Sequence, residues 1–469
     1  MLQTIGSRRV SGLGVLVGVS LVASRAASGQ ADFSVYRSLG DSLTHGTQGG
    51  KVVDYRTQPF AYPVYLAEKM GTSFELPLLT EATGMDIQSR VDAPNFVAGA
   101  NLAVNGATLH HALYRTADPL SPPNYESSDR TDVVLAPRTG ATQVSAAVSD
   151  GATFTTAWLG GNDFLNTLTK YGTVLHDFLG QVGIPWPTDP LNVSDLTDQA
   201  SFATDYADMM SALTAVPGMK MAVANFPDLE HIAGVLNKDQ ITALVGPNPM
   251  PADALTSELM AAAILFDDVA MWGSDIWTVD MLADPDNYWD AAEAAAIDTA
   301  IDGFNATIAD EAALHDVALV DIKSIFGDLA ENGYMIGDWE VNTEWYVSNL
   351  GEMKASVFSS DGAHPSDIGH GLIANAFIDA INSHYGTTLP LLSEAELMAI
   401  LDGDKFVDND LDGRIEGISA SGVPWLAVNT FMPDFTGDSG EIPVPEPASV
   451  ALLAAGVGLA LGRRRRTDT

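Results

Sequence analysis

Hydrophobic and polar positions along this chain alternate between short apolar runs and longer stretches with helical spacing. Apolar runs of strand length occupy residues 35–40, 96–103, 152–159, 219–225 and 317–321. Helical spacing of apolar residues is found over residues 59–70, 139–149, 164–168, 199–216, 290–315 and 366–381. Strands that alternate with helices predict crossover connections and a parallel sheet covered on both faces.

Turn residues close three of the predicted strands. Gly-Asp-Ser ends the first at residues 40–42, Asn105-Gly106 ends the second, and Gly-Gly-Asn-Asp at 160–163 ends the third. Because ligands of parallel sheets bind beyond the carboxyl ends of the strands, we expect these turns to border one site. Residues 228–289, rich in Ala, Met and Trp, fit no strand–helix unit and are expected to pack as an insertion over the sheet ends.

Composition narrows the class of protein. With 469 residues, 46% hydrophobic and 18% charged, the chain is globular, with room for one large core or two ordinary ones. A formal charge of −39 argues against nucleic acid or anionic headgroups as partners. Cysteine is absent, which excludes disulfides, a thiol nucleophile and cysteine-ligated zinc or iron–sulfur sites.

The N-terminal segment has the order of an export signal. Arg8-Arg9 precede an apolar stretch over residues 13–23, and small residues follow at 26–31. The apolar stretch is shorter than the roughly 20 residues that span a bilayer. We therefore expect export, with cleavage near Ala26 or Ala31.

The C-terminal segment has the order of a sorting tail. Pro445-Glu446-Pro447 leads into an apolar run over 448–461 and then into four arginines at 463–466, which would stay on the cytoplasmic side. This arrangement resembles the bacterial PEP-CTERM sorting signal. The resemblance implies a transient membrane anchor formed by the apolar helix, cleavage near the triplet, and release toward the cell surface or extracellular matrix. The alternative is a permanent tail anchor.

Ser42 is the candidate nucleophile. A serine in a small-residue turn after a strand leaves its hydroxyl open to a base and to a substrate carbonyl. Asp361-Gly362-Ala363-His364-Pro365 places an acid three residues before a histidine, so one loop can supply both the base and its carboxylate partner. Gly106 offers an unobstructed backbone N–H, and Asn162 a carboxamide, as donors to an oxyanion. Taken singly, each segment is equally an ordinary turn or capping site.

Taken together, Gly40-Asp41-Ser42-Leu43, Gly106, Gly160-Gly161-Asn162-Asp163 and Asp361-Gly362-Ala363-His364 resemble, in their order, the SGNH (GDSL) hydrolases over about residues 33–385. The resemblance implies a flavodoxin-like three-layer α/β/α sandwich with a parallel sheet of about five strands. It also implies that Ser42 is the nucleophile, His364 the base, Asp361 its partner, and Ser42, Gly106 and Asn162 the oxyanion donors. The stretch over 228–360 is longer than a minimal family member needs, which leaves the pocket and the substrate open.

Other polar clusters are weaker candidates. Asp361, His364, Asp367 and His370 could be pictured as a metal site, but His370 is expected on the following helix. His45, His110 and His111 are either pocket or surface histidines. No cofactor is required by the predicted chemistry.

The segment from Asp408 has the first half of a calcium loop. Asp408, Asp410 and Asp412 alternate before Gly413, but Ser419 stands where the loop needs a glutamate. The segment is therefore either a calcium site or a solvated acidic run, which calcium titration of the protein distinguishes.

The sequence thus predicts a signal peptide (1–31), an SGNH hydrolase domain (32–386), an acidic linker or small module (387–442) and a sorting tail (443–469). The predicted function is an exported, monomeric serine esterase acting on lipid acyl esters or on acetyl esters of a polysaccharide. The competing class is a non-catalytic extracellular matrix or carbohydrate-binding protein that keeps the fold, and a peptidase is a further option.

Overall fold

A parallel β-sheet forms the centre of the protein. The computed structural model describes residues 31–49, 53–80, 87–168, 170, 172–173, 187–265, 278–411 and 415. The sheet has the strand order β1-β4-β5-β8, formed by Tyr36–Gly40, Phe154–Trp158, Lys220–Ala224 and Ala318–Val320. All pairs are parallel, with Gly40 opposite Trp158 and Val223 opposite Leu319. Every residue of β4 is buried, as expected for a strand covered on both faces.

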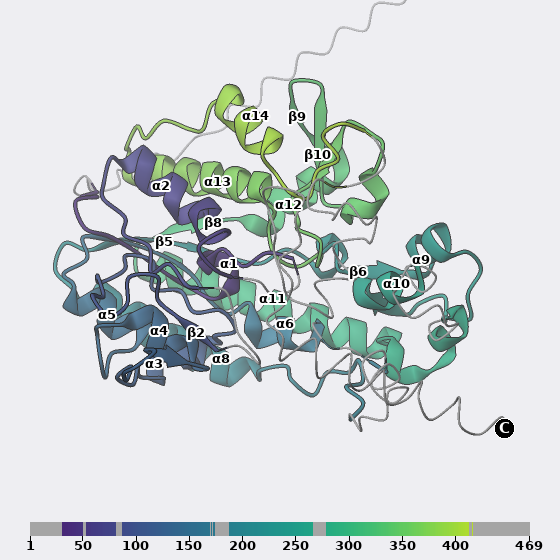
Figure 1. Cartoon of the computed structure of the whole chain (residues 1–469), viewed down its shortest axis with the longest axis horizontal. Helices are drawn as coiled ribbons and strands as arrows, with labels where there is room; N and C mark the ends of the chain where they lie inside the picture. The colour runs from purple at the N-terminus through teal and green to yellow at the C-terminus, as the bar shows by residue number, and fades with distance from the viewer. Residues whose placement is uncertain are drawn as a thin grey trace, which may run out of the picture.

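Helices cover the sheet on both sides (Figure 1). Helices α2 (Tyr62–Met70) and α13 (Asp367–Tyr385) pack against each other on one face, and α13 contacts β5 and β8. On the other face, α8 (Gln199–Thr214) lies between α5 (Gln143–Ser149) and α11 (Ala291–Leu314), with α3 (Leu109–Tyr114) beside it. The predicted α/β sandwich is therefore confirmed.

The sheet differs from the prediction at one edge. Residues 96–103 do not form a regular strand, but Leu102 N donates to Ser38 O (2.8 Å) and Val104 N donates to Gly40 O (3.1 Å). A parallel bridge joins Ser38 to Asn101. An extended segment thus lies where a fifth strand was predicted, although the sheet counts four strands among the described residues.

The insertion has its own small elements. It contains a 3₁₀ turn η2 (Leu229–His231), an antiparallel pair β6 (Val235–Asn237) and β7 (Leu255–Ser257), and helices α9 (Lys238–Val245) and α10 (Glu258–Leu265). Helix α12 (Ile322–Asn332) packs against η2. Beyond α12, β9 (Tyr334–Ile336), β10 (Trp339–Asn342) and β11 (Lys354–Ser356) form a second sheet that leads to the His364 loop. The sequence patterns indicated none of these elements.

Residues after the predicted hydrolase domain share its core. Helix α14 (Glu394–Asp402) packs against α13, and Leu397, Leu401 and Phe406 belong to the main hydrophobic core. Lys69 on α2 pairs with Glu396 at 2.6 Å. The first part of the predicted linker is therefore structurally joined to the hydrolase domain.

Two predicted targeting segments cannot be compared with the structure. The export signal and the apolar run over 448–461 lie outside the described residues. Among the helices that are described, none has the length and apolar content needed to cross a bilayer.

Candidate active site

Ser42 lies at the start of a short helix directly after β1. Helix α1 (Ser42–His45) begins with Asp41 as its N-cap, whose Oδ1 accepts from Leu43 N at 3.0 Å. A Cβ on Gly40 would lie 2.1 Å from Thr44 Oγ1, so the tight turn from strand to helix requires glycine there. The sequence thus places the serine at the carboxyl end of β1.

The Gly106 turn lies beside this helix. Asn101 Nδ2 donates to Thr44 O at 2.9 Å, and its Oδ1 accepts from Ser38 Oγ at 3.0 Å. Gly106 has a φ of +80° and no atom within 4 Å of the position of a Cβ. Glycine is therefore favoured there by the backbone conformation, and its surface is free of side chains.

Asn162 links the Gly106 turn to the end of β4. It begins helix α6 (Asn162–Leu168), and its Nδ2 donates to Ala107 O at 3.0 Å. The next residue, Asp163, accepts from Leu109 N at 2.9 Å through Oδ2. A Cβ on Gly161 would lie 2.6 Å from Asp41 Oδ2, so the Asn162 turn also packs against the residue before Ser42. The three predicted turns do meet at one edge of the sheet.

Asp361 and His364 form a hydrogen-bonded pair within one loop. His364 Nδ1 lies 2.8 Å from Asp361 Oδ2, and His364 N donates to Asp361 Oδ1 at 2.9 Å. Burial alone would raise the pKa of Asp361, but the His364 charge and the hydrogen bonds lower it to about 2. The carboxylate is therefore ionised at neutral pH, which holds the proton on Nδ1 and leaves Nε2 as the acceptor.

Ser359 connects this loop to the chain that follows α1. Its hydroxyl accepts from Gly49 N at 3.0 Å and lies 3.2 Å from Asp361 Oδ1 and 3.0 Å from His364 O. An apolar cavity of about 20 Å³ is lined from both sides, by Leu43 next to the serine and by Ala363 next to the histidine. Within the described residues no hydrogen bond joins the Ser42 hydroxyl to the imidazole, and such contacts often tighten only when substrate binds. No sequence pattern pointed to Ser359.

Asp41 is a buried acid beside the candidate nucleophile. Burial raises its pKa to about 7, against the opposing effects of the Leu43 N–H and the His364 charge. Its Oδ2 has no hydrogen-bond partner among the described residues. The pKa of Asp163 is also raised by burial. Both carboxyls serve as acceptors for backbone N–H groups at the ends of strands.

The remaining histidines lie apart from this pair or act within the core. His45 and His370 are fully buried, and desolvation lowers the pKa of each to about 3, so both are neutral. His370 lies on α13, as predicted, and its Nδ1 accepts from Tyr62 N at 3.3 Å. This nitrogen is therefore used in a hydrogen bond within the core. His110 pairs with Asp205 at 3.0 Å and is exposed.

No group of three metal-binding side chains is found among the described residues. Asp408 Oδ2 accepts from Gly351 N at 2.7 Å, while Asp412 lies outside the described residues. The calcium loop therefore stays a prediction.

Comparison with known proteins assigns the family. The family model described as GDSL-like Lipase/Acylhydrolase matches residues 37–377, so the chain belongs to this family. It is a carboxylic ester hydrolase of the GDSL type. No curated protein matches the chain.

Distant likenesses to solved structures include proteins with two different activities. An acetylxylan esterase, Axe2 from Geobacillus stearothermophilus, is 11% identical with a TM-score of 0.35, covering 76% of this chain and 95% of that one. A phospholipase A1 from Streptomyces albidoflavus NA297 is 16% identical with a TM-score of 0.33, covering 74% and 98%. These likenesses are too weak to assign either activity to this chain.

The first prediction concerns the glycine between the acid and the histidine. Gly362 has a φ of +63°, and a Cβ there would lie 2.4 Å from Gly234 N. We expect Gly362→Ala to displace the loop and lower kcat/KM for p-nitrophenyl acetate on the order of a hundredfold. Gly351→Ala is the control, because Gly351 has a φ of +75° but no atom within 4 Å of a Cβ. Equal losses of activity in the two variants would contradict the prediction.

The second prediction follows from the raised pKa of Asp41. A folded-state pKa of about 7, above the ordinary 3.8, means that its stabilising contribution is present below about pH 4 and is lost as the pH rises to about 7. The variant Asp41→Asn cannot ionise. Relative to the wild type, its free energy of unfolding should therefore increase between pH 4 and 7, by at most about 4 kcal/mol, and then level off. Urea unfolding at several pH values in this range measures the difference in unfolding free energy between variant and wild type. Asp338→Asn, at an exposed acid, is the control. The prediction is refuted if the difference for Asp41→Asn is as independent of pH as that of the control.

Proposed function

We propose that this protein is an exported serine esterase that works through an acyl-enzyme on Ser42. The observation that supports this most is the ionised Asp361 hydrogen-bonded to His364, in a loop joined through Ser359 to the chain after Ser42. A base oriented by a carboxylate, beside a serine at a strand end, is the arrangement that nucleophilic acyl transfer needs.

In the proposed mechanism His364 Nε2 takes the proton of Ser42 as Oγ attacks the ester carbonyl carbon. The tetrahedral intermediate collapses when the imidazolium returns this proton to the leaving alkoxide, which departs as an alcohol. Asp361 stabilises the imidazolium and fixes its orientation. Water, deprotonated in turn by His364, then attacks the acyl-enzyme and releases the carboxylic acid and free Ser42.

The negative oxygen of each tetrahedral intermediate needs donors held in advance. We assign this role to the N–H groups of Ser42 and Gly106 and to the carboxamide of Asn162. One N–H of Asn162 is used by Ala107 O, which orients the amide and leaves its second N–H for the substrate. Because the donors belong to helix starts and turns fixed by strand ends, they need little reorganisation during the reaction.

Export and surface release complete the proposal. They are supported by the order of basic, apolar and small residues at the N-terminus and by Pro445-Glu446-Pro447 ahead of the apolar and arginine segments. The substrate is a small-molecule or polysaccharide ester, the chain works as a monomer without nucleic acid, and the membrane is contacted through the C-terminal helix alone. No cofactor takes part in the reaction.

Loss of the nucleophile tests the enzyme assignment. Ser42→Ala should abolish hydrolysis of p-nitrophenyl acetate and labelling by a fluorophosphonate probe, because no other group forms the acyl-enzyme. Asn162→Ala should keep the labelling but lower kcat on the order of a hundredfold through the lost oxyanion donor. Ser149→Ala, an exposed serine, is the control. An unlabelled, inactive wild type would favour the non-catalytic binding protein instead.

Mass spectrometry of the protein from its native culture tests export. We expect an N-terminus created near Ala26 or Ala31 and a C-terminus created near the Pro445–Pro447 triplet, in the extracellular or surface fraction. Recovery of the uncut chain from the cytoplasm would contradict this part of the proposal and leave the esterase assignment unaffected.

A further inference from the structure

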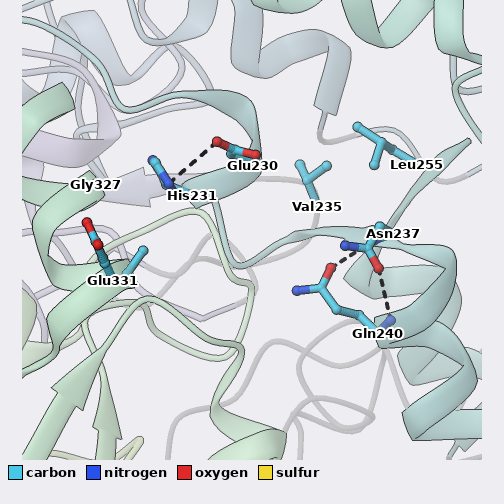
Figure 2. Close-up of a pocket in the computed structure, with 9 residues that line it drawn as sticks. Glu230, His231, Val235, Asn237, Gln240, Leu255, Gly327 and Glu331 are labelled. Carbon is cyan, nitrogen blue, oxygen red and sulfur yellow. Dashed lines mark hydrogen bonds and ion pairs between the residues drawn. The ribbon is translucent and has the colours of Figure 1, made fainter. Parts of the chain in front are cut away.

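A polar hollow lies beside the candidate active site. It has a volume of about 550 Å³ and is formed by η2, β6, the start of α9 and β7 on the insertion and by α12. Figure 2 shows Glu230, His231 and Glu331 on one side of it and Asn237 and Gln240 on the other.

This hollow and the apolar cavity near Ser42 share one wall. His231 lines the hollow while its neighbour Ile232 lines the cavity. On α12, Gly327 lines the hollow while Phe326 lines the cavity. Neighbouring residues of the same two segments therefore line the hollow and the cavity beside Leu43.

The hollow has hydrogen-bonding groups of both kinds, and two of its side chains are held in place by hydrogen bonds. Asn237 Oδ1 accepts from Gln240 N at 3.0 Å, and Gln240 Oε1 accepts from Asn237 N at 2.9 Å, in the capping box of α9. This pairing uses both amide oxygens, so each side chain presents its NH₂ group as a donor (Figure 2). Glu230 and Glu331 are acceptors. His231 Nδ1 is buried without a hydrogen-bond partner among the described residues.

The negative charge of the hollow favours a neutral alcohol over an anionic one. Its described lining includes two glutamates and neither lysine nor arginine. Lys323, on the same helix as Glu331, is already paired with Asp228 and Asp302 at 2.7 Å each. A phosphodiester headgroup would meet like charge here, whereas the hydroxyls of a neutral sugar can donate to carboxylates and accept from amides.

The apolar cavity suits a short acyl group. It is small, at about 20 Å³, and its described lining is apolar, including Leu43, Phe164 and Phe358. A longer acyl chain would have to extend out of this space. The polar hollow and the apolar cavity together suit a short acyl group attached to a polyhydroxy alcohol.

We propose that the hollow between η2, α9 and α12 binds sugar units of a neutral acetylated polysaccharide whose acetyl ester reacts at Ser42. This rests on the esterase function proposed above. It assigns the insertion the role of recognising the alcohol side of the ester.

Removal of the two carboxylates tests the assignment. In Glu230→Ala/Glu331→Ala, kcat/KM for an acetylated oligosaccharide of four sugar units should fall about tenfold or more, chiefly through KM, since each hydrogen bond to a charged group is lost. The same ratio for p-nitrophenyl acetate should stay within about twofold, because that ester does not reach the hollow. Glu68→Ala/Asp338→Ala removes two exposed acids elsewhere and should change neither.

Binding without turnover separates this inference from the esterase assignment. By isothermal titration, the Ser42→Ala chain should bind the deacetylated oligosaccharide, and adding Glu230→Ala/Glu331→Ala should weaken binding about tenfold. Equal binding with and without the glutamates, equal loss on both esters, or a preference of the wild type for phosphatidylcholine vesicles overturns the sugar site. A wild type inactive on every ester would instead overturn the proposed function, while the titration still decides whether sugar binds.

Discussion

The position of the His364 loop depends on a contact between two backbones. Gly362 stands between Asp361 and His364 in the chain, and its carbonyl oxygen accepts from Gly234 N at 2.8 Å. A Cβ on Gly234 would in turn lie 3.1 Å from Asp361 O. Gly362 has no room for a side chain, because a Cβ there would lie 2.4 Å from Gly234 N, and Gly234 is tightly packed, so the loop lies directly against the insertion. The long stretch between β5 and β8 therefore helps to position the Asp361–His364 loop.

The acids at this edge of the sheet show why one of them is suited to support a base. Asp41 and Asp163 are buried acceptors for backbone N–H groups, and burial raises the pKa of each. Asp361 is also removed from water, yet its pKa is lowered because an imidazole and two backbone N–H groups face it. Burial favours the neutral acid, and a hydrogen-bonded cation favours the carboxylate. The His364 charge also acts on Asp41, but of these three acids only Asp361 is hydrogen-bonded to the imidazole.

The sequence was sufficient for the parts of the fold that repeat a simple pattern. The strands ending at Gly40 and Trp158, and the long helices after Asp198 and Asp290, follow from apolar periodicity and capping residues. The predicted strand over 96–103 has an apolar run of strand length, but only its second half lies along β1, and Val97 in its first half is exposed. Periodicity reports burial and not hydrogen bonding, so it cannot separate the two cases.

What the sequence could not indicate are contacts made by chain topology. In the sequence Ser359 is an ordinary loop serine. Only the folded chain brings Gly49, 310 residues away, to its hydroxyl. The elements over 228–289 are short, and the sequence of α10 is apolar at almost every position, so no window carries a clear period. The four matching motifs indicated the candidate site but not the residues around it.

The insertion both contacts the His364 loop and lines the polar hollow. Gly234 contacts the loop of the proposed base, while His231 and Val235 on either side of it line the polar hollow. A shift of this segment by a ligand in the hollow would be transmitted to Asp361 and His364 through the glycine contact, which has no flexible side chain to absorb it. Because positioning of a base within a fraction of an ångström affects the rate, an alcohol that fits the hollow and holds the segment in place would favour the productive geometry of the loop. Selection of the substrate and alignment of the base would then depend on the same few residues of backbone.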